Sequence, residues 1–595
     1  MRSFKGGIGL WLFERNQTIL KWNRYVINLV SFAVFALMIA RYGFNYEKDL
    51  THFWIIAIRS LYSFYAFHFI FRLVLARNRL QFIADQWFEA TLFTLILANA
   101  ISYFVFSVSQ LQKVIPLEHT LYEFVLLLLL LILAFTEFVK SLNFIISKKI
   151  KPTTLFIGSY IILIVVGTGL IMLPGFNVNR TFLDFYDAFF ISTSATCITG
   201  LSTLTVVEVF NFKGQVLLLI LFQLGGIGIL TFASFFATFI KKGLGIKHQI
   251  LMNELFDSDS LSGSFSLLKR ILILLFGIEL LGAVAMYFLW GDYAFESEGQ
   301  RIFYTVFHSV SAFCNAGFSL FPEGIETTGV RNLYLLHWVI ILLAFSGSLG
   351  FPTLRDIFSP RRLRERIRLP WKGWKTSTQI SLYTGFALLI LGAIAYYVLW
   401  IRHLEPYNKG ITAVTLSLFQ SVNLRSCGMS ALDLSTLPTP LIMASMFLMF
   451  VGGGSSSLAG GIKTSTFIVA VTAIISTIRG RKEATLGRRT ISNDLIYRAF
   501  AVILFSGNFT LLVTTILTFT DPNIPFLKLA FEAVSATGNT GASMGITGEL
   551  SNAGKLIISF AMFSGRVGLL TLAFALSSKE KPNTVRYPHT HIIIG

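Results

Sequence analysis

The chain has 595 residues, of which 54% are hydrophobic and only 13% are charged, and its formal net charge is +19. A soluble chain of this length normally forms several domains with more charged surface, so the composition excludes an ordinary soluble protein. Apolar runs of about 20 residues recur from end to end, and each is long enough to cross a bilayer as a helix. Lysine and arginine lie in the short loops between these runs and form no basic stripe, which argues against nucleic-acid binding.

Twelve membrane-spanning helices are expected. They lie at about 22–42, 53–76, 88–109, 119–140, 154–174, 216–240, 266–290, 332–352, 378–401, 439–470, 495–519 and 555–577. The N-terminus, which begins Met1-Arg2-Ser3, lacks the cleavage site of a signal peptide, so the first run is expected to remain as a span. The three cysteines are too few for a disulfide framework and have no zinc-binding spacing.

Basic residues gather in loops that fall on one side of the membrane if the spans alternate. They are Lys148, Lys149, Lys151, Lys241, Lys242, Lys247, Arg355, Arg361, Arg362, Arg364, Arg366, Arg368, Lys372, Lys375, Arg479, Arg481, Lys482, Arg488 and Arg489. By the positive-inside rule this side is the cytoplasm, and both termini then lie inside. The opposite loops carry acidic residues, among them Asp184, Asp187 and Glu298. The chain is therefore predicted to be a multi-pass protein of the cell (inner) membrane.

Residues 1–152 hold the first four spans and form the first predicted domain. Segment 64–99, with Arg72, Arg79 and Asp85, faintly resembles the second and third helices of voltage-sensor modules. The fourth span has no arginine at every third position, and it therefore offers no obvious charge to move in the membrane field. Packing, or stabilisation of a dimer, is the simpler interpretation of these helices.

Four later stretches share one pattern, in which an aromatic residue is followed by a small, hydroxyl-rich segment and a terminal glycine. They are residues 190–200, 307–317, 419–428 and 531–541. The terminal glycines are spaced 117, 111 and 113 residues apart, and a fixed period of this kind indicates repeated units. Each unit is expected to contain a span, a short half-helix, a small-residue loop and a second span.

The half-helices are too short to cross the membrane, so each must end at membrane depth. Non-helical backbone is tolerated there only where it is buried in protein or lines a water-filled cavity. Four copies around one axis would form a pore whose narrowest ring is made of backbone carbonyls, which replace the water shell of a monovalent cation. Small residues also serve helix packing in membranes, but four glycines in register after the same kind of segment favour the pore.

The span at 439–470 contains a glycine- and serine-rich stretch at 452–463. Each glycine costs about 1 kcal/mol in a helix relative to alanine, so we expect a loop to break this span. A phosphate-binding loop is a poor alternative, because Ile462 separates Gly461 from Lys463 and no strand precedes the stretch. Arg566 lies inside the last span, where an arginine normally faces a cavity or a partner.

From residue 153 to 595 the chain resembles the Trk/Ktr/HKT superfamily of cation transporters, and most closely its bacterial pore-forming subunits. The resemblance rests on the four glycine segments and on matches in the second helices, at 223–228, 452–464 and 565–568, and in the tail from Arg586 to Gly595. It implies an all-α integral membrane fold with four span–pore-helix–filter-loop–span repeats around one pore. The predicted domains are 1–152, 153–240, 241–358, 359–480, and 481–595 with the C-terminal tail.

The resemblance also implies roles for named residues. The filter that binds potassium would comprise Cys197, Ile198, Thr199, Gly200, Cys314, Asn315, Ala316, Gly317, Ser426, Cys427, Gly428, Gly538, Asn539, Thr540 and Gly541. The gate would comprise Gly452, Gly453, Gly454, Ser455, Ser456, Ser457, Gly460, Gly461, Lys463 and Arg566. Alternatives for the gate are a packing kink at the loop and a pairing of Arg566 with backbone carbonyls. In the family, glycine at all four filter positions implies potassium, whereas serine in the first implies a sodium preference.

Two filter segments depart from the family pattern. The first has Cys197 where threonine is usual, and the third has Ser426-Cys427 where threonine and alanine are usual. These residues are small, so a backbone filter is retained while its fine selectivity is less certain. The cysteines are expected to pack behind the filter, since one per repeat at differing offsets makes no metal-ligand set.

The resemblance implies potassium uptake, as a channel or coupled to sodium or protons, by a homodimer in membrane lipid. Potassium would be the transported ion, with no organic cofactor. A cytoplasmic nucleotide-binding ring (TrkA/KtrA-like) would dock at 241–270 and 355–375 and regulate the pore. Because the chain shows no nucleophile–base set or phosphate loop, enzymatic catalysis is not expected. The second hypothesis is a partner-gated sensor that conducts little, and a potassium flux assay separates the two.

Overall fold

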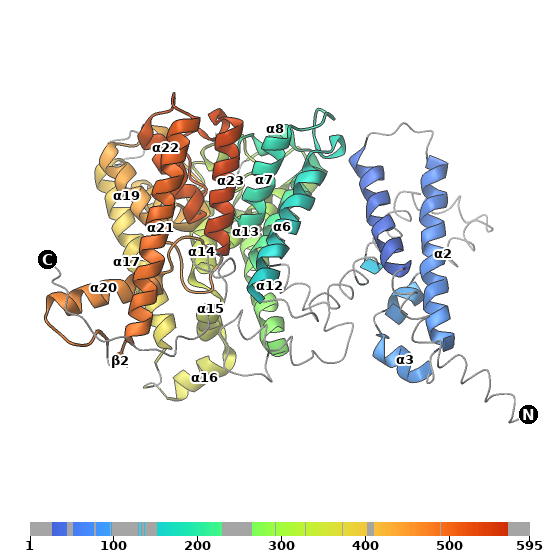
Figure 1. Ribbon diagram of the computed structural model, residues 1–595, viewed down its shortest axis with the longest axis horizontal. Coiled ribbons are helices and arrows are strands. Elements are labelled where there is room, and N and C mark those ends of the chain that lie inside the picture. The colour runs from blue at the N-terminus through green and yellow to red at the C-terminus, as the bar shows by residue number, and fades with distance from the viewer. Residues whose placement is uncertain are drawn as a thin grey trace, which may run out of the picture.

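The computed structural model describes residues 26–44, 51–75, 79–97 apart from 88 and 96, single positions between 129 and 136, 152–228, 264–401 apart from 292, 328, 370 and 372, and 410–568 apart from 488. This part of the chain is almost entirely helical (Figure 1). Its named strands form one short antiparallel hairpin of β1 (Thr485–Leu486) and β2 (Arg489–Thr490). The predicted all-α membrane class is confirmed.

Within the described residues, four helices are long and apolar enough to cross a membrane. They are Val26–Gly43, Lys269–Leu289, Thr376–Leu399 and Asn493–Thr520. Helices α14 (Tyr334–Leu349) and α15 (Phe351–Phe358) pass the same test as a pair, but they are bent by 109°. Shorter apolar helices lie at the predicted spans that begin near 154, 216 and 439. The predicted spans at 88–109 and 119–140, and the loop lysines at 148–151 and 241–247, lie largely or wholly outside the described residues.

The order of long helix, short helix and second helix occurs four times after residue 151. The first helices are α6 (Pro152–Ile171), α12 (Ser264–Leu289), α17 (Thr376–Leu399) and α21 (Asn493–Thr520). The short helices are α7 (Phe185–Cys197), α13 (Glu298–Cys314), α18 (Gly410–Val422) and α22 (Phe526–Gly538). The second helices are α9 (Phe212–Ile227), α14, α19 (Thr439–Phe450) and α23 (Asn552–Val567). The domain boundaries drawn from the sequence stay predictions.

The short helices form the interior of this helical body. Helices α7, α13 and α22 begin after a polar or proline cap, at Asp184, Ser297 and Pro525. The Asp184 carboxylate accepts a hydrogen bond from the Tyr186 backbone N–H at 2.9 Å. The four aromatic residues that open the repeated pattern are fully buried. They are Phe190, Phe307, Phe419 and Phe531. Close packing of these rings against neighbouring helices stabilises the short helices in the interior, because van der Waals packing, rather than removal from water, drives contacts between membrane helices.

The predicted span at 439–470 is broken, as its glycine content indicates. Helix α19 ends at Phe450, and α20 (Thr464–Ile478) begins only after a non-helical segment, residues 451–463, which we call the inner loop. A parallel bridge joins Val451 to Ile462 and closes the inner loop at its base. The break places this backbone inside the protein, where its polar groups need partners other than lipid.

The N-terminal helices lie beside the main body in Figure 1 and include Val26–Gly43, α2 (Thr51–Leu75) and α3 (Arg79–Asp85). Arg72 on α2 forms an ion pair of 3.1 Å with Glu89, which is consistent with packing. A Cβ on Gly175, after α6, would lie 2.0 Å from the Tyr42 carbonyl oxygen, so the first helix touches the main body at its end. Four N-terminal spans remain a prediction.

Glycines set the distance between second helices and short helices. A Cβ on Gly347 of α14 would lie 2.0 Å from the Phe313 carbonyl oxygen, and one on Gly225 of α9 would lie 2.0 Å from that of Thr196. Helices therefore meet backbone to backbone, an approach that small residues permit in membrane proteins.

We predict that Gly347→Ala lowers the free energy of unfolding by about 1–3 kcal/mol, because the added methyl group displaces α13 from α14. Gly169→Ala is the matched control, since a Cβ there meets nothing within 4 Å and α6 would gain helix propensity. Thermal unfolding of both variants in mild detergent measures the difference. Equal midpoints for the two variants would contradict the packing argument.

Candidate functional site

Three of the four short helices end in the same backbone conformation. In these three the next residue is left-handed, with φ of 56° at Ile198, 57° at Asn315 and 47° at Asn539. The third ends instead in a π-helical turn, η7 (Asn423–Cys427), which is wider than an α-helical turn and coincides with the one-residue-shorter spacing between Phe419 and its glycine. Every copy then reaches its glycine at positive φ: Gly200 at 94°, Gly317 at 73°, Gly428 at 73° and Gly541 at 85°. Glycine is required here because L side chains rarely adopt these angles.

The four glycine segments lie against one another and close a ring. A Cβ on Gly200 would lie 2.7 Å from the Ala316 carbonyl oxygen, and one on Gly317 would lie 2.4 Å from that of Cys427. The ring continues from Gly428, whose Cβ would lie 2.2 Å from the Thr540 carbonyl oxygen.

The ring returns to its start at Gly541, whose Cβ would lie 2.0 Å from the Thr199 carbonyl oxygen. The oxygens that meet at the ring thus belong to the residues before each glycine. They are Thr199, Ala316, Cys427 and Thr540. Carbonyl oxygens carry partial negative charge and no proton, so this set can bind a dehydrated cation and has nothing to offer an anion.

Backbone hydrogen bonds hold the segments in place. The N–H of Thr199, Ala316 and Thr540 donates to the carbonyl five residues earlier at 2.9, 2.8 and 2.9 Å, and the N–H of Gly428 donates to Asn423 at 2.7 Å. These bonds fix the backbone of each segment at the end of its short helix.

Side chains also tie neighbouring segments together. The Asn539 amide donates to the Thr199 hydroxyl and to the Met562 carbonyl, both at 2.8 Å. The Ser426 hydroxyl donates to the Asn315 amide oxygen at 3.2 Å. The side chains of Asn539 and Ser426 thus join neighbouring segments.

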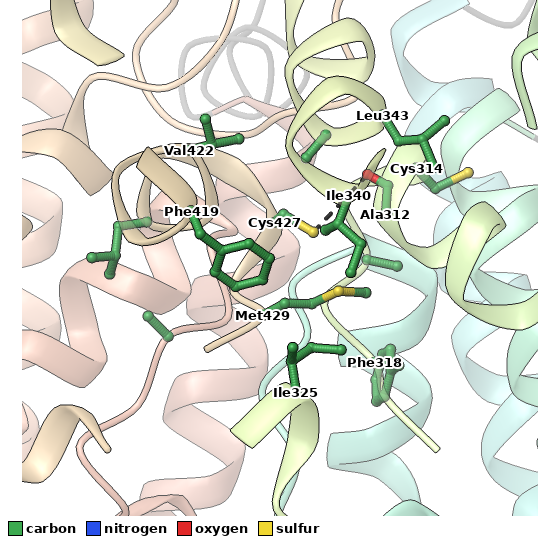
Figure 2. Close-up of a cluster of buried hydrophobic side chains, with 14 of the residues drawn as sticks. Ala312, Cys314, Phe318, Ile325, Ile340, Leu343, Phe419, Val422, Cys427 and Met429 are labelled. Carbon is green, nitrogen blue, oxygen red and sulfur yellow. Dashed lines mark hydrogen bonds between the residues drawn. The ribbon is translucent and has the colours of Figure 1, made fainter. Parts of the chain in front are cut away.

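The three cysteines are free and buried. The Cys427 thiol points toward the Ala312 carbonyl at 4.0 Å, among the apolar side chains between the second and third segments (Figure 2). The Cys314 thiol donates to the Gln223 amide oxygen at 3.4 Å. These positions agree with the packing role expected for them.

A serine two residues after each ring glycine was missed by the sequence analysis. Ser202, Ser319, Ser430 and Ser543 each accept a hydrogen bond from the N–H two residues on, at 3.1–3.4 Å. In three segments the residue after the buried aromatic reaches this turn: His308 to Ser319 at 3.1 Å, Gln420 to Ser430 at 3.1 Å, and Glu532 through Thr547 to Ser543.

The first segment differs, since Ile191 occupies the corresponding position and its side chain is apolar. We call these contacts between the polar residue and the serine turn the clamp. The polar residues at the second position of the pattern could have predicted it, because polar side chains that are fully buried need partners.

Arg425 also has contacts that the sequence did not predict. It is buried, and its guanidinium donates to the Gly385 carbonyl at 3.1 Å and to the Gly452 carbonyl at 3.0 Å. Arg425 therefore connects the third segment to α17 and to the start of the inner loop. No acidic side chain in the described part of the chain forms an ion pair with it.

The inner loop lies directly against the end of α22. A Cβ on Gly460 would lie 2.4 Å from the Gly538 carbonyl oxygen. Hydrogen bonds also join the inner loop to α14, since Gly454 N–H donates to the Ser348 carbonyl at 2.7 Å and Leu458 N–H to the Gly347 carbonyl at 3.3 Å. The inner loop is thus fixed between the second and fourth units.

Arg566 meets the inner loop, as expected. Its guanidinium donates to the Leu458 carbonyl and, at 3.1 Å, to the Gly225 carbonyl. Lys463 donates to the Ala459 carbonyl at 2.5 Å. Both cations line a cavity of about 450 Å³ that also includes Gly460 and Gly538. Arg566 therefore pairs with backbone carbonyls, which was the alternative interpretation. It also lies beside the predicted gate residues.

Fold and site together define a polytopic membrane protein with a closed ring of buried carbonyls beside a cation-lined cavity. The model of the TrkH family, described as a cation transport protein, matches residues 157–587. The chain therefore belongs to the TrkH family of cation transport proteins, and it is a membrane transport protein rather than an enzyme.

Relatives agree with this assignment, and a solved structure shares the fold. The chain is 36% identical to the Ktr system potassium uptake protein B of Bacillus subtilis over 75% of this chain and 96% of that protein. It is 32% identical to the potassium/sodium uptake protein NtpJ of Enterococcus hirae over 76% of this chain and 98% of that protein. The crystal structure of the potassium transporter TrkH from Vibrio parahaemolyticus has the same fold, with a TM-score of 0.58 and 16% identity over 81% of this chain and 97% of that one.

Ser430→Ala is expected to lower the free energy of unfolding by about 1–3 kcal/mol, because the buried Gln420 amide loses its partner. Adding Gln420→Leu should restore most of the loss, since replacing both partners by apolar groups is nearly neutral. Thermal unfolding in detergent measures both, with Ser435→Ala, at an exposed position, as the control. Purely additive losses in the double variant would contradict the clamp.

Proposed function

We propose that this protein takes up potassium across the cell (inner) membrane through the carbonyl ring, which acts as its selectivity filter. The observation that carries the proposal is the closure of four glycine segments into one ring of backbone oxygens. Such oxygens replace the hydration shell of a monovalent cation. The names of the relatives, potassium uptake protein B and potassium/sodium uptake protein NtpJ, support a monovalent cation as substrate.

In this proposal the four helix triplets are repeats around one pore, and each contributes one carbonyl-bearing segment. Glycine at all four positions favours potassium over sodium. The predicted filter then spans positions 197–200, 314–317, 426–428 and 538–541. Ile198, Asn315 and Asn539 set its backbone through their left-handed angles rather than by binding the ion.

The inner loop is proposed as the gate. It lies against the end of α22, and Arg566 and Lys463 bring positive charge to the cavity beside it. A fixed positive charge in a low-dielectric surround repels potassium, so the closed state combines a steric and an electrostatic barrier. Opening would break the carbonyl contacts of Arg566 with Leu458 and Gly225.

Orientation and partners complete the proposal. The basic residues on α16 (Pro360–Arg368) would face the cytoplasm, where a nucleotide-binding ring would dock at 241–270 and 355–375 and act on the gate. Two copies would form a homodimer with one pore each, and both termini would be cytoplasmic. Coupling to sodium or protons is a further part of this proposal that flux against separate ion gradients would test.

The first functional prediction concerns Gly200→Ser. A Cβ there would lie 2.7 Å from the Ala316 carbonyl oxygen, so the side chain crowds the ring and the preference for potassium over sodium should fall about tenfold. Gly545→Ser is the control, because its φ of 85° is equally strained for serine but a Cβ there meets nothing within 4 Å. Permeability ratios in proteoliposomes measure both. A Gly200→Ser ratio equal to that of the control would refute the filter.

The second functional prediction concerns Arg566→Gln. Removing one positive charge from the cavity should raise potassium flux on the order of tenfold without any regulatory partner. Selectivity should not change, because the ring keeps its carbonyls. Arg498→Gln is the control, since Arg498 is exposed and pairs with Asp494 at 3.0 Å. Correctly inserted Arg566→Gln protein that conducts no faster than its parent would place the gate elsewhere.

A further inference from the structure

A second cavity, separate from the carbonyl ring, opens between α12, the α14–α15 bend and α16. Its volume is about 1020 Å³. Its lining divides into a basic end and an apolar wall. The basic end contains Arg270, Arg355 and Arg362.

The basic end has more positive charge than its acidic neighbours balance. Arg362 forms an ion pair with the buried Asp356, whereas Arg270 and Arg355 form no ion pair with an acid in the described part of the chain. Glu365 is the acid in the cavity lining, against three arginines. Two guanidinium groups are therefore available to an anion from outside the chain, and guanidinium groups bind phosphate in bidentate geometry.

The apolar wall follows one face of α12. Arg270 is succeeded along the lining by Ile273 and Leu274, then by Gly277 and Ile278, then by Leu281, at the three- and four-residue steps of a helix face. These positions extend over about 16 Å of helix.

Space along this wall is open to the surroundings. Ile273 and Leu281 are 61% and 72% exposed, and α12 belongs to the candidate membrane spans, so these side chains face lipid. A Cβ on Gly277 would meet nothing within 4 Å, which leaves the middle of the wall as a groove.

We propose that this cavity binds an anionic phospholipid. The phosphate would lie between Arg270 and Arg355, and an acyl chain would lie in the groove at Gly277. Basic pockets between membrane helices on the cytoplasmic side suit anionic headgroups. A free phosphate ion would use the basic end alone, so the apolar wall favours the lipid.

A lipid bound in this cavity would also support the position of α15. Phe351 lines both this cavity and the cavity beside the inner loop, and its N–H donates to the Ser456 carbonyl at 3.4 Å. Phe351 therefore connects the lining of this cavity to the inner loop.

Native mass spectrometry of the delipidated full chain, titrated with phosphatidylglycerol or with phosphatidylcholine of the same acyl chains, tests the proposal. The parent should bind one phosphatidylglycerol in preference to phosphatidylcholine. The Arg270→Gln/Arg355→Gln variant should bind phosphatidylglycerol about thirtyfold more weakly, because the loss of each arginine should weaken binding about five- to sixfold. Arg368→Gln is the matched control, because Arg368 lies on α16 and does not line the cavity.

Gly277→Phe separates the two sources of phosphate. It fills the groove and keeps the arginines, so it should abolish lipid preference, and inorganic phosphate should not compete with lipid in the parent. Size-exclusion profiles confirm that each variant is folded. The proposal is overturned if the double arginine variant binds like the parent, if Arg368→Gln loses as much, or if Gly277→Phe binds normally while inorganic phosphate displaces the lipid.

Discussion

The arrangement of this protein depends on backbone meeting backbone at four glycines. At Gly200, Gly317, Gly428 and Gly541 a side chain would occupy the space of a neighbouring carbonyl, and each glycine also has a positive φ. No other residue type satisfies both conditions at little cost. The ring exists because four short helices deliver such a glycine to the same place, and a longer helix packs against each of them.

Buried polar backbone at this depth is stable only if its hydrogen bonds are satisfied inside the protein. The N–H groups before the ring are bonded to the short helices, the serine turns after it are bonded to His308, Gln420 and Glu532, and the inner loop is bonded to α14 and Arg566. The carbonyls of Thr199, Ala316, Cys427 and Thr540 lie at the contacts between neighbouring segments. A cation is the ligand that such oxygens suit, which connects the packing of the fold to transport.

Much of this could be predicted from the sequence, because it follows from local rules. The glycine period indicated four similar segments, and the glycine-rich stretch at 452–463 indicated the break between α19 and α20. The resemblance to a transporter family placed Arg566 beside that break. These features depend on residues close in the chain or on a repeated motif.

The remaining features of the fold and site depend on contacts between residues far apart in the chain, which the spacing of motifs does not predict. Arg425 reaches Gly385 and Gly452, and Gln223 donates to the buried Glu279 of α12 at 3.1 Å. The π-helical turn of the third segment was also not expected, although its one-residue-shorter spacing was visible. Long-range pairings of this kind require the packed structure, since spacing alone does not specify which buried polar groups meet.

The central claim is that the carbonyls of Thr199, Ala316, Cys427 and Thr540 together bind the transported cation. Crystals of the protein soaked in rubidium or thallium, which replace potassium and scatter anomalously, test it most directly. We expect an anomalous peak on the axis of the ring, within coordination distance of all four oxygens, that weakens when potassium is added back. A ring without a peak, in crystals where the ion binds elsewhere along the path, would contradict it.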